Sequence, residues 1–259
     1  MAAVIEVSRL AKRFGPKMVL RNLDFSVEQG EFVALLGPNG AGKTTFLRIL
    51  SSLSSATVGR VSIAGYELPR QAAAVRRRLG VVSHLPLLYG DLTAEENLQF
   101  YGRMYAVSGL ERRIGDVLET VGLSPRRKDL VRTFSRGMQQ RLAIARAVLH
   151  DPDVLLLDEP HTGLDQDACE MLDTVLRQVA SQGRTVVMTS HDLARIEALA
   201  TRFDVLTRGN VRASVASSAV AQDGILAFYR KALEDAREPV GARPALPGRG
   251  PLPGEGRPS

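Results

Sequence analysis

The run Gly37–Thr45, which reads Gly-Pro-Asn-Gly-Ala-Gly-Lys-Thr-Thr, constrains the fold more than any other feature of this chain. It follows Phe32–Leu36, an apolar stretch typical of a strand buried on both faces, and it leads into a helical pattern over Thr45–Ser52. In this context the glycines let consecutive backbone N–H groups close around phosphate oxygens, and the helix N-terminus adds positive charge. The sequence therefore predicts an α/β core with a phosphate-binding loop.

Two side chains at the end of this loop predict what it binds. The Lys43 ammonium is predicted to bridge the β- and γ-phosphates of a nucleotide, and the Thr44 hydroxyl to ligate Mg²⁺. ATP and Mg²⁺ are therefore the predicted cofactors. The predicted nucleotide contacts of the loop are Gly37, Pro38, Asn39, Gly40, Ala41, Gly42, Lys43, Thr44 and Thr45.

Two further predicted strands end in residues that suit catalysis. The strand at 154–157 is followed by Asp158, predicted to hold Mg²⁺ through water, and by Glu159, predicted to receive the proton of an attacking water. The strand at 185–189 is followed by His191. A single histidine after a strand is usually a capping or surface residue. The position of His191 after this strand instead favours a catalytic role. Its imidazole is then expected to donate a hydrogen bond to the γ-phosphate and to hold Glu159 and the attacking water in line for the reaction.

The alternation of strands and helices after the loop predicts a mostly parallel, covered sheet. Residues 84–150 are expected to be mostly helical, with a capping box between Thr93 and Glu96. The last 24 residues, 236–259, hold six Pro and five Gly and are expected to be disordered. The other expected strands are 4–10, 19–27 and 58–63, and the other expected helices are 112–121, 137–149, 167–181, 193–200 and 221–237.

Composition excludes several classes of protein. The chain has no run of about 20 apolar residues, so a membrane span is not expected. Its start lacks the pattern of a secretory signal, and its single cysteine, Cys169, suits a reducing compartment, so we expect a cytoplasmic location. The net charge of +6 comes from scattered arginines without interleaved aromatic residues. This pattern favours a solvated surface that can lie near acidic lipid headgroups, and it disfavours nucleic-acid binding.

One more motif narrows the function. Phe134–Leu142 reads Phe-Ser-Arg-Gly-Met-Gln-Gln-Arg-Leu and comes shortly before the strand that ends in Asp158. Together with the loop, the acidic strand end and His191, it resembles the ATP-binding-cassette (ABC) ATPases over residues 3–210. The resemblance implies a P-loop NTPase core of mostly parallel sheet, an N-terminal antiparallel β-subdomain and an inserted helical subdomain at about 84–150. The ABC domain would then span residues 1–235.

The resemblance assigns roles to four more residues. Phe14 falls where family members stack an aromatic ring on adenine, although a core phenylalanine is the alternative. Asp165, in Gly163-Leu164-Asp165, matches the loop through which each subunit senses the site of the other. Ser135 and Gly137 open a helix and are implied to cap the γ-phosphate bound by a second chain. A homodimer, or a pair of ATPase subunits, is therefore the expected working unit.

The sequence departs from the family pattern at two places. The usual Leu-Ser-Gly-Gly-Gln has Arg136 in place of its first glycine and Met138 in place of its glutamine. Family members also place a glutamine that contacts Mg²⁺ and water in the loop before the helical subdomain. Counting back from Tyr89 and Thr93 puts His84 in that position, with Leu85 as the alternative register, so His84 is a hypothetical metal or water contact.

Within the family, the short length and the motif variants resemble the ATPase subunits of ABC-2-type exporters, most of all the haem-exporter ATPase of cytochrome c biogenesis. This resemblance implies integral membrane subunits as partners and a peripheral position on the cytoplasmic face of the membrane. An ABC-2 exporter of another substrate, such as a drug or lipid, and a soluble non-transport ABC ATPase are the alternatives. The expected docking groove, which could instead be core packing, comprises Leu87, Leu88, Tyr101 and Tyr105.

Overall fold

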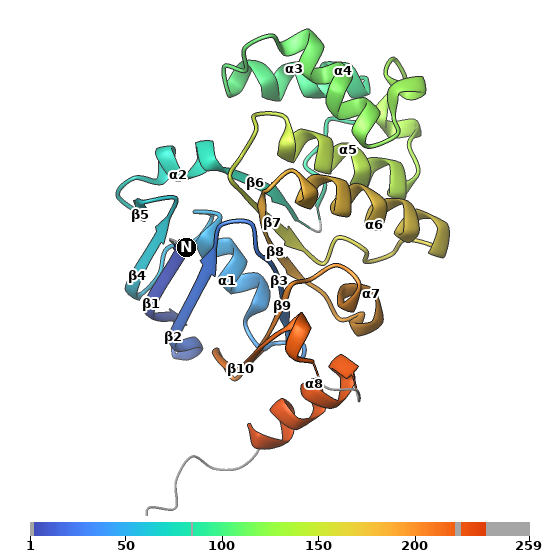
Figure 1. The fold of residues 1–259 in the computed structure, drawn as a ribbon. Coiled ribbons are helices and arrows are strands. Elements are labelled where there is room, and N and C mark those ends of the chain that lie inside the picture. Colours follow the sequence, from blue (N-terminus) through green and yellow to red (C-terminus); the bar gives the residue numbers. More distant parts are fainter. Residues whose placement is uncertain (1–2, 84, 221–223, 237–259) are drawn as a thin grey trace, which may run out of the picture.

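The computed structural model of the chain describes residues 3–83, 85–220 and 224–236. Within these residues, two β-sheets lie on either side of helix α1 (Lys43–Leu50) (Figure 1). The smaller sheet is antiparallel, with the spatial order β2, β1, β4, β5. Its strands are β1 (Ala3–Phe14), β2 (Lys17–Glu28), β4 (Val58–Ile63) and β5 (Tyr66–Leu68).

The larger sheet has the spatial order β10, β9, β3, β8, β7, β6, and only β10 runs antiparallel to its neighbour. This arrangement confirms the predicted α/β class with a mostly parallel sheet. Because the parallel strands all end at one edge, the loops that follow β3, β8 and β7 meet there. The strands are β3 (Phe32–Leu36), β6 (Leu79–Val82), β7 (Val154–Asp158), β8 (Thr185–Thr189), β9 (Arg202–Thr207) and β10 (Asn210–Ala216).

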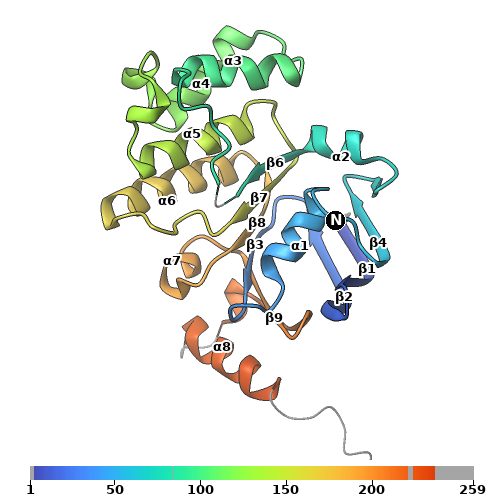
Figure 2. The same cartoon turned by 180° about the vertical axis from the view of Figure 1, so that it is seen from behind.

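Helices cover the outer face of the larger sheet and extend beyond it (Figures 1 and 2). Helix α5 lies between the sheet and the pair formed by α3 and α4, so it joins the helical region to the core. The helices after α1 are α2 (Ala72–Arg78), α3 (Ala94–Met104), α4 (Leu110–Thr120), α5 (Arg136–Val148), α6 (Gln166–Ser181), α7 (Leu193–Glu197) and α8 (Gly224–Asp235). Short 3₁₀ turns lie at Ser124–Arg126, Val131–Thr133 and Ser217–Ala219.

Strand β3 shows why its sequence is almost wholly apolar. Phe32, Ala34 and Leu36 point to the core formed with the outer helices, while Val33 and Leu35 point to the core formed with α1 and the smaller sheet. Successive side chains of a strand alternate between faces, so a strand covered on both sides needs apolar residues at every position. The strand that leads into the phosphate loop is therefore held from both sides.

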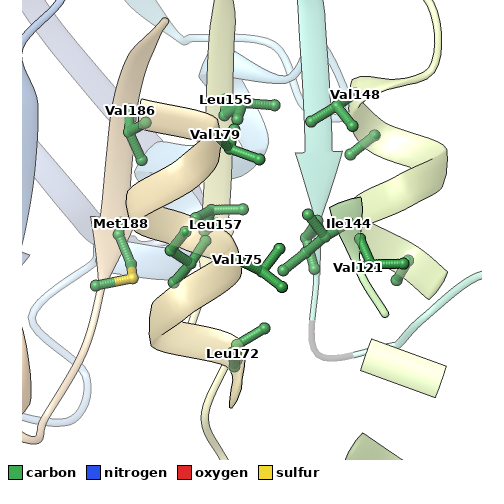
Figure 3. Packing of buried hydrophobic residues seen from close by; sticks show 14 of the residues in the cluster. Val121, Ile144, Val148, Leu155, Leu157, Leu172, Val175, Val179, Val186 and Met188 are labelled. Carbon is green, nitrogen blue, oxygen red and sulfur yellow. The ribbon is translucent and has the colours of Figure 1, made fainter. Parts of the chain in front are cut away.

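Helix α6 is anchored over β7 and β8 by one apolar stripe (Figure 3). Leu172, Val175 and Val179 recur at helical spacing, and all three are buried. Figure 3 shows Val175 directed toward Ile144 of α5, so the same stripe also joins the two helices. The loop between β7 and α6, which carries Glu159, is thus fixed at its helical end by this core.

Most of the elements expected from the sequence are present within a few residues, and the capping box at Thr93 is confirmed with both of its hydrogen bonds. Helix α7 ends at Glu197, three residues earlier than expected. The elements β5, α2, β6, β9 and β10 were not predicted. Residues 237–259, expected to be disordered, lie outside the described part of the chain. Within the described part, no helix is both long and apolar enough to cross a membrane.

A cluster of charged side chains around the buried Glu95 connects the start of α3 to residues 127 and 128. Glu95 is buried and accepts a 2.6 Å hydrogen bond from Arg127 Nη2, and Lys128 Nζ lies 2.9 Å from its other oxygen. The hydrogen bonds from Arg127 and Lys128 lower the pKa of Glu95 to about 2. Since an unfolded glutamate titrates near 4.5, this contribution to stability is present above pH 4.5 and is lost as the pH falls toward 2.

Glu95→Gln is therefore expected to lower the free energy of unfolding by roughly 1.5–3 kcal/mol at pH 7. The difference from the wild type should shrink as the pH is lowered from 4.5 toward 2. Urea unfolding at several pH values measures both quantities. Glu111→Gln is the matched control, because Glu111 bonds the same Arg127 but is exposed, and such pairs contribute about 1 kcal/mol or less. Equal stability of Glu95→Gln and the wild type at pH 7 would contradict the prediction.

Candidate active site

The phosphate loop runs from the end of β3 to the start of α1, and close contacts require two of its glycines, Gly37 and Gly42. A Cβ on Gly37 would lie 2.1 Å from the carbonyl oxygen of Leu206, a residue of β9. Gly42 has a φ of 111°, a conformation that favours glycine, and a Cβ there would lie 2.8 Å from the side chain of Leu20. The loop is therefore shaped by its contacts with β2 and β9.

The N-terminus of α1 lacks a side-chain cap. Gly42 occupies the capping position, and the first turn has no acidic residue. A side chain caps the N-terminus of α3, α5, α6 and α7, whereas α2 and α4, like α1, have no such cap. The first N–H groups of a helix carry partial positive charge and need acceptors. This end of α1 is thus suited to an anion such as a phosphate.

Lys43 lies at the first position of α1 and is only 7% exposed. Its Nζ donates a 2.6 Å hydrogen bond to the carbonyl oxygen of Gly37 and a 3.4 Å bond to that of Pro38. Burial lowers the pKa of Lys43, while the nearby carboxylates of Glu159 and Asp158 raise it. The ammonium group is held inside the loop, where it can neutralise phosphate charge.

Asp158, at the end of β7, lies beside the hydroxyl of the phosphate loop. Thr44 Oγ1 donates to Asp158 Oδ1 at 3.3 Å, and Thr189 Oγ1 donates to the same oxygen at 2.8 Å. A buried carboxylate beside a hydroxyl is a donor set that suits Mg²⁺ with water in its other positions. The residues present therefore fit this ion, although no group of three or more His, Cys, Asp or Glu of the described residues forms a metal cluster.

Glu159 and His191 are brought together by the adjacent strands β7 and β8. His191 Nδ1 lies 3.3 Å from Glu159 Oε2, and Thr162 Oγ1 donates to the same oxygen at 3.2 Å. The φ of Glu159 is 49°. Its backbone N–H donates hydrogen bonds to the carbonyl oxygen and to the hydroxyl of Thr189. A left-handed conformation is uncommon for glutamate, and such strain is often found at functional sites.

A cavity of about 590 Å³ lies over the phosphate loop. Lys43, Thr44 and Glu159 line it, and so does Phe14. Phe14 is 52% exposed, so it is not a core residue, and its ring has Lys12 Nζ 4.6 Å from the centroid. An exposed aromatic ring beside a phosphate site is available for stacking on a base.

The sequence analysis missed three basic residues of this cavity. Lys17 and Arg21 line it from β2, on the same side as Val19, and Arg208 lines it from the turn between β9 and β10. Their cationic groups favour an anionic ligand. Alternation along β2 could have indicated Lys17 and Arg21, since residues two apart share a face of a strand. No local pattern indicated Arg208.

The residues expected to act on a second chain lie outside this cavity. Ser135 caps α5 by accepting from the N–H of Met138, and Asp165 caps α6 by accepting from that of Ala168. A Cβ on Gly137 would lie 2.8 Å from the Cβ of Ala168, so the glycine allows α5 to approach α6. The two capped helix ends therefore belong to one surface of the chain.

The variant residue Arg136 is part of the same surface. Its guanidinium lies over Gly163, because a Cβ built on Gly163 would be 2.9 Å from the Arg136 Cζ. Arg136 therefore packs the start of α5 against the loop that precedes α6. His84, the hypothetical metal or water contact, lies outside the described residues.

Sequence comparison places these features in a known family. A family model described as "ABC transporter" matches residues 20–162, more than half of the chain. The linearmycin resistance ATP-binding protein LnrL of Bacillus subtilis (strain 168) is 38% identical over 211 residues, covering 80% of this chain and 68% of that protein. A Nod factor export ATP-binding protein I of Paraburkholderia xenovorans (strain LB400) is 39% identical over 220 residues, covering 84% and 72%.

Solved structures agree with this assignment. A structure described as the ATP-binding subunit of an ABC transporter matches with a TM-score of 0.80 and 30% identity, covering 89% of this chain and 99% of that one. An ATP-binding cassette solved as a dimer in a post-hydrolysis state with ADP and Pi matches with a TM-score of 0.74 and 29% identity, covering 82% and 98%. The chain belongs to the ABC transporter family and is an ABC ATPase, the ATP-binding subunit of such a transporter.

Proposed function

We propose that two ATPase subunits, either two copies of this chain or this chain and a paired subunit, enclose ATP at shared sites and thereby drive export through separate membrane subunits. The observation that carries this proposal is a division of the site. Lys43, Thr44, Asp158, Glu159 and His191 gather at one edge of the sheet, whereas the capped ends of α5 and α6 lie outside the nucleotide cavity. One chain therefore holds two separate halves of a site.

In this proposal, the phosphate-loop side binds and cleaves the nucleotide. Backbone N–H groups of the loop and the Lys43 ammonium hold the β- and γ-phosphates, and the exposed ring of Phe14 stacks on adenine. Glu159 accepts the proton of the attacking water, and His191 donates to the γ-phosphate and holds Glu159 in line. Mg²⁺, held by Thr44 and through water by Asp158, would neutralise charge on the phosphates.

The other half of the site serves the partner. The N-terminus of α5, with Ser135 and Gly137, would meet the γ-phosphate bound by the second subunit, and Asp165 would sense that site. The dimeric cassette with ADP and Pi is similar to this chain over most of its length, which supports the pairing. ATP binding closes such a dimer, and hydrolysis opens it.

The membrane subunits would dock on the groove beside α3. Leu87, Tyr101 and Tyr105 line a cavity of about 180 Å³ there, and Leu87 is 55% exposed, whereas Leu88 packs against the core. Tyr101 packs against the same core as Leu88, so core packing is observed for these two residues, and docking at the groove is part of the proposal. Arg146 donates to the carbonyl oxygens of Val81, Pro86 and Leu87, which ties the groove to α5 and so to the start of that helix. Docking would hold the chain on the cytoplasmic face of the membrane.

The names of the relatives and the motif variants carry the proposals for the direction of transport and for its cargo. The relatives described above are named for Nod factor export and for linearmycin resistance, and the motif variants resemble ABC-2 exporters. These names support export as the direction. Haem export for cytochrome c biogenesis stays a prediction from the sequence, beside export of another substrate such as a drug or lipid.

The test is affinity purification from membranes. Full-length chain, purified from a membrane extract with ATP present, is expected to carry an integral membrane protein in a constant ratio. Tyr101→Ala with Leu87→Asp should reduce that association at least tenfold and leave ATP binding unchanged, because neither residue lines the nucleotide cavity. Leu226→Asp on α8, another exposed apolar residue, is the control. Association with ribosomes or DNA instead of a membrane protein would contradict the proposal.

A further inference from the structure

Three charged or titratable side chains behind the active-site edge form a buried cluster. Asp173 of α6 is the centre of it. Its Oδ1 lies 2.8 Å from His161 Nε2, and its Oδ2 accepts a 2.6 Å hydrogen bond from Arg195 Nη1. The side chains of His161, Asp173 and Arg195 are 9%, 8% and 14% exposed. A buried carboxylate with a donor on each oxygen is held in one orientation.

The protonation of the cluster follows from its contacts. Burial lowers the pKa of His161, and the hydrogen bond that Arg195 donates to Asp173 raises the pKa of Arg195. Asp173 is the ion-pair partner of Arg195, and a carboxylate can only accept hydrogen bonds. The imidazole of His161 must then carry its proton on Nε2. The cluster has one ion pair and one neutral donor, all three fixed by mutual contacts.

The cluster joins the two segments that carry the catalytic side chains. His161 lies two residues after Glu159, in the loop between β7 and α6. Arg195 lies in the first turn of α7, four residues after His191. Arg195 also forms an ion pair with Asp192, at 3.4 Å from Nε to Oδ2, and Asp192 caps α7 directly beside His191.

Glu159 and His191 themselves are poorly held by packing. Their side chains are 29% and 67% exposed, and they meet only through the 3.3 Å contact between Nδ1 and Oε2. The β7–β8 pairing and the bonds from the Glu159 N–H to Thr189 set the backbone spacing, so the placement of the two side chains depends further on the segments that follow these strands. Helix α6 can hold both segments in place, because it is itself fixed. Leu172 and Val175, on either side of Asp173, are buried in the apolar core (Figure 3).

We propose that His161, Asp173 and Arg195 are positioning residues, which hold the Glu159 segment against the His191 segment through α6 at the spacing that ATP hydrolysis needs. None of the three lines the nucleotide cavity, so they act through other residues. The inference rests on the proposed roles of Glu159 and His191. It goes beyond them by assigning the control of their spacing to three residues that no sequence motif indicated.

The decisive variant is Asp173→Asn, which keeps the shape of the side chain and removes the negative charge that pairs with Arg195. The rate constant kcat for ATP hydrolysis is expected to fall about 10- to 100-fold, because a displacement of about 1 Å at reacting groups has effects of this size. The ATP dissociation constant and KM should stay within about twofold of the wild type. Arg177→Gln, an exposed charge-to-amide change one turn further along α6, is the control that should leave all three values unchanged.

A double-mutant cycle separates positioning from a general structural role. If Asp173 acts through Glu159, then adding Asp173→Asn to Glu159→Gln should cause no further loss of the residual hydrolysis rate. The inference is overturned if Asp173→Asn hydrolyses ATP at the wild-type rate, if its ATP affinity falls together with kcat, or if its loss is the same in both backgrounds. If Glu159→Gln alone leaves the rate of ATP hydrolysis at the wild-type value, that result contradicts the proposed function instead of this inference.

Arg195→Lys keeps the test possible if Asp173→Asn does not fold. Lysine retains a positive charge toward Asp173 but cannot reach Gln166 and Asp192 as well, as the forked guanidinium does. It should lower kcat roughly 3- to 10-fold with ATP affinity unchanged. An Arg195→Lys protein with wild-type kcat would overturn the inference.

Discussion

Glutamine in place of Glu159 is expected to lower the rate of ATP hydrolysis about 10²- to 10⁴-fold, the usual contribution of a general base. The amide has the shape of the carboxylate, and the backbone hydrogen bonds from residue 159 to Thr189 do not depend on the side chain. Only the ability to accept a proton from water is removed. The ATP dissociation constant should therefore stay within about twofold. Phosphate release and equilibrium ATP binding measure the two quantities.

The same variant should trap the closed dimer. In the proposed cycle hydrolysis reopens the dimer, so Glu159→Gln with ATP is expected to elute as a dimer in size-exclusion chromatography, whereas the wild type should return to monomer as ATP is consumed. Glu170→Gln, an exposed carboxylate on α6, is the control for the change of charge. Steady hydrolysis by Glu159→Gln at the wild-type rate would show that this glutamate is not the base.

Alanine in place of Lys43 is expected to abolish tight ATP binding and to lower hydrolysis by at least about 10²-fold, as loss of a phosphate-stabilising donor does in other enzymes. Lys43 Nζ lies inside the phosphate loop, where burial lowers the pKa of the ammonium group in the absence of an anion. Its removal therefore takes away a group that is costly to the free protein and favourable to the ATP complex.

Thermal unfolding distinguishes this effect from misfolding. The Tm of the free Lys43→Ala protein should equal or exceed that of the wild type, while the rise in Tm caused by ATP should disappear. Arg48→Ala, an exposed cation at the other end of α1, should keep the full ATP-induced rise. A Lys43→Ala protein that ATP still stabilises as much as the wild type would rule out the assigned role.

The strands that carry the site could be predicted because their patterns are local. The apolar run of β3, the largely apolar runs of β7 and β8 and the glycines between β3 and α1 are patterns of residues within a few positions of one another. Strand β9 was missed because its apolar pattern is interrupted. Asp204 is buried within it and is satisfied by Arg202 and by Ser214 of β10. A partner on the following strand, which the local pattern does not indicate, makes this polar residue tolerable there.

Two glycines also show that a local pattern does not reveal every structural requirement on a residue. From the sequence, Gly37 was explained by phosphate binding and Gly137 by contact with a partner's nucleotide. In the structure, a Cβ on Gly37 would collide with the carbonyl of Leu206, and one on Gly137 with Ala168. These contacts are a second reason why glycine is needed at both positions, and they come from β9 and α6 of the same chain. Motif matching alone could not reveal it.

The sequence by itself determined the phosphate loop, the acidic end of β7, the histidine after β8 and the family, because each is a short pattern with its own physical requirement. Only the tertiary structure decided which side chains meet. Asp173 contacts His161, 12 residues before it, and Arg195, 22 residues after it, and Arg208 reaches the cavity from a distant turn. The folding of parallel strands and of α6 brings these distant residues together near one edge of the sheet. Their separation along the chain does not predict which of them come into contact.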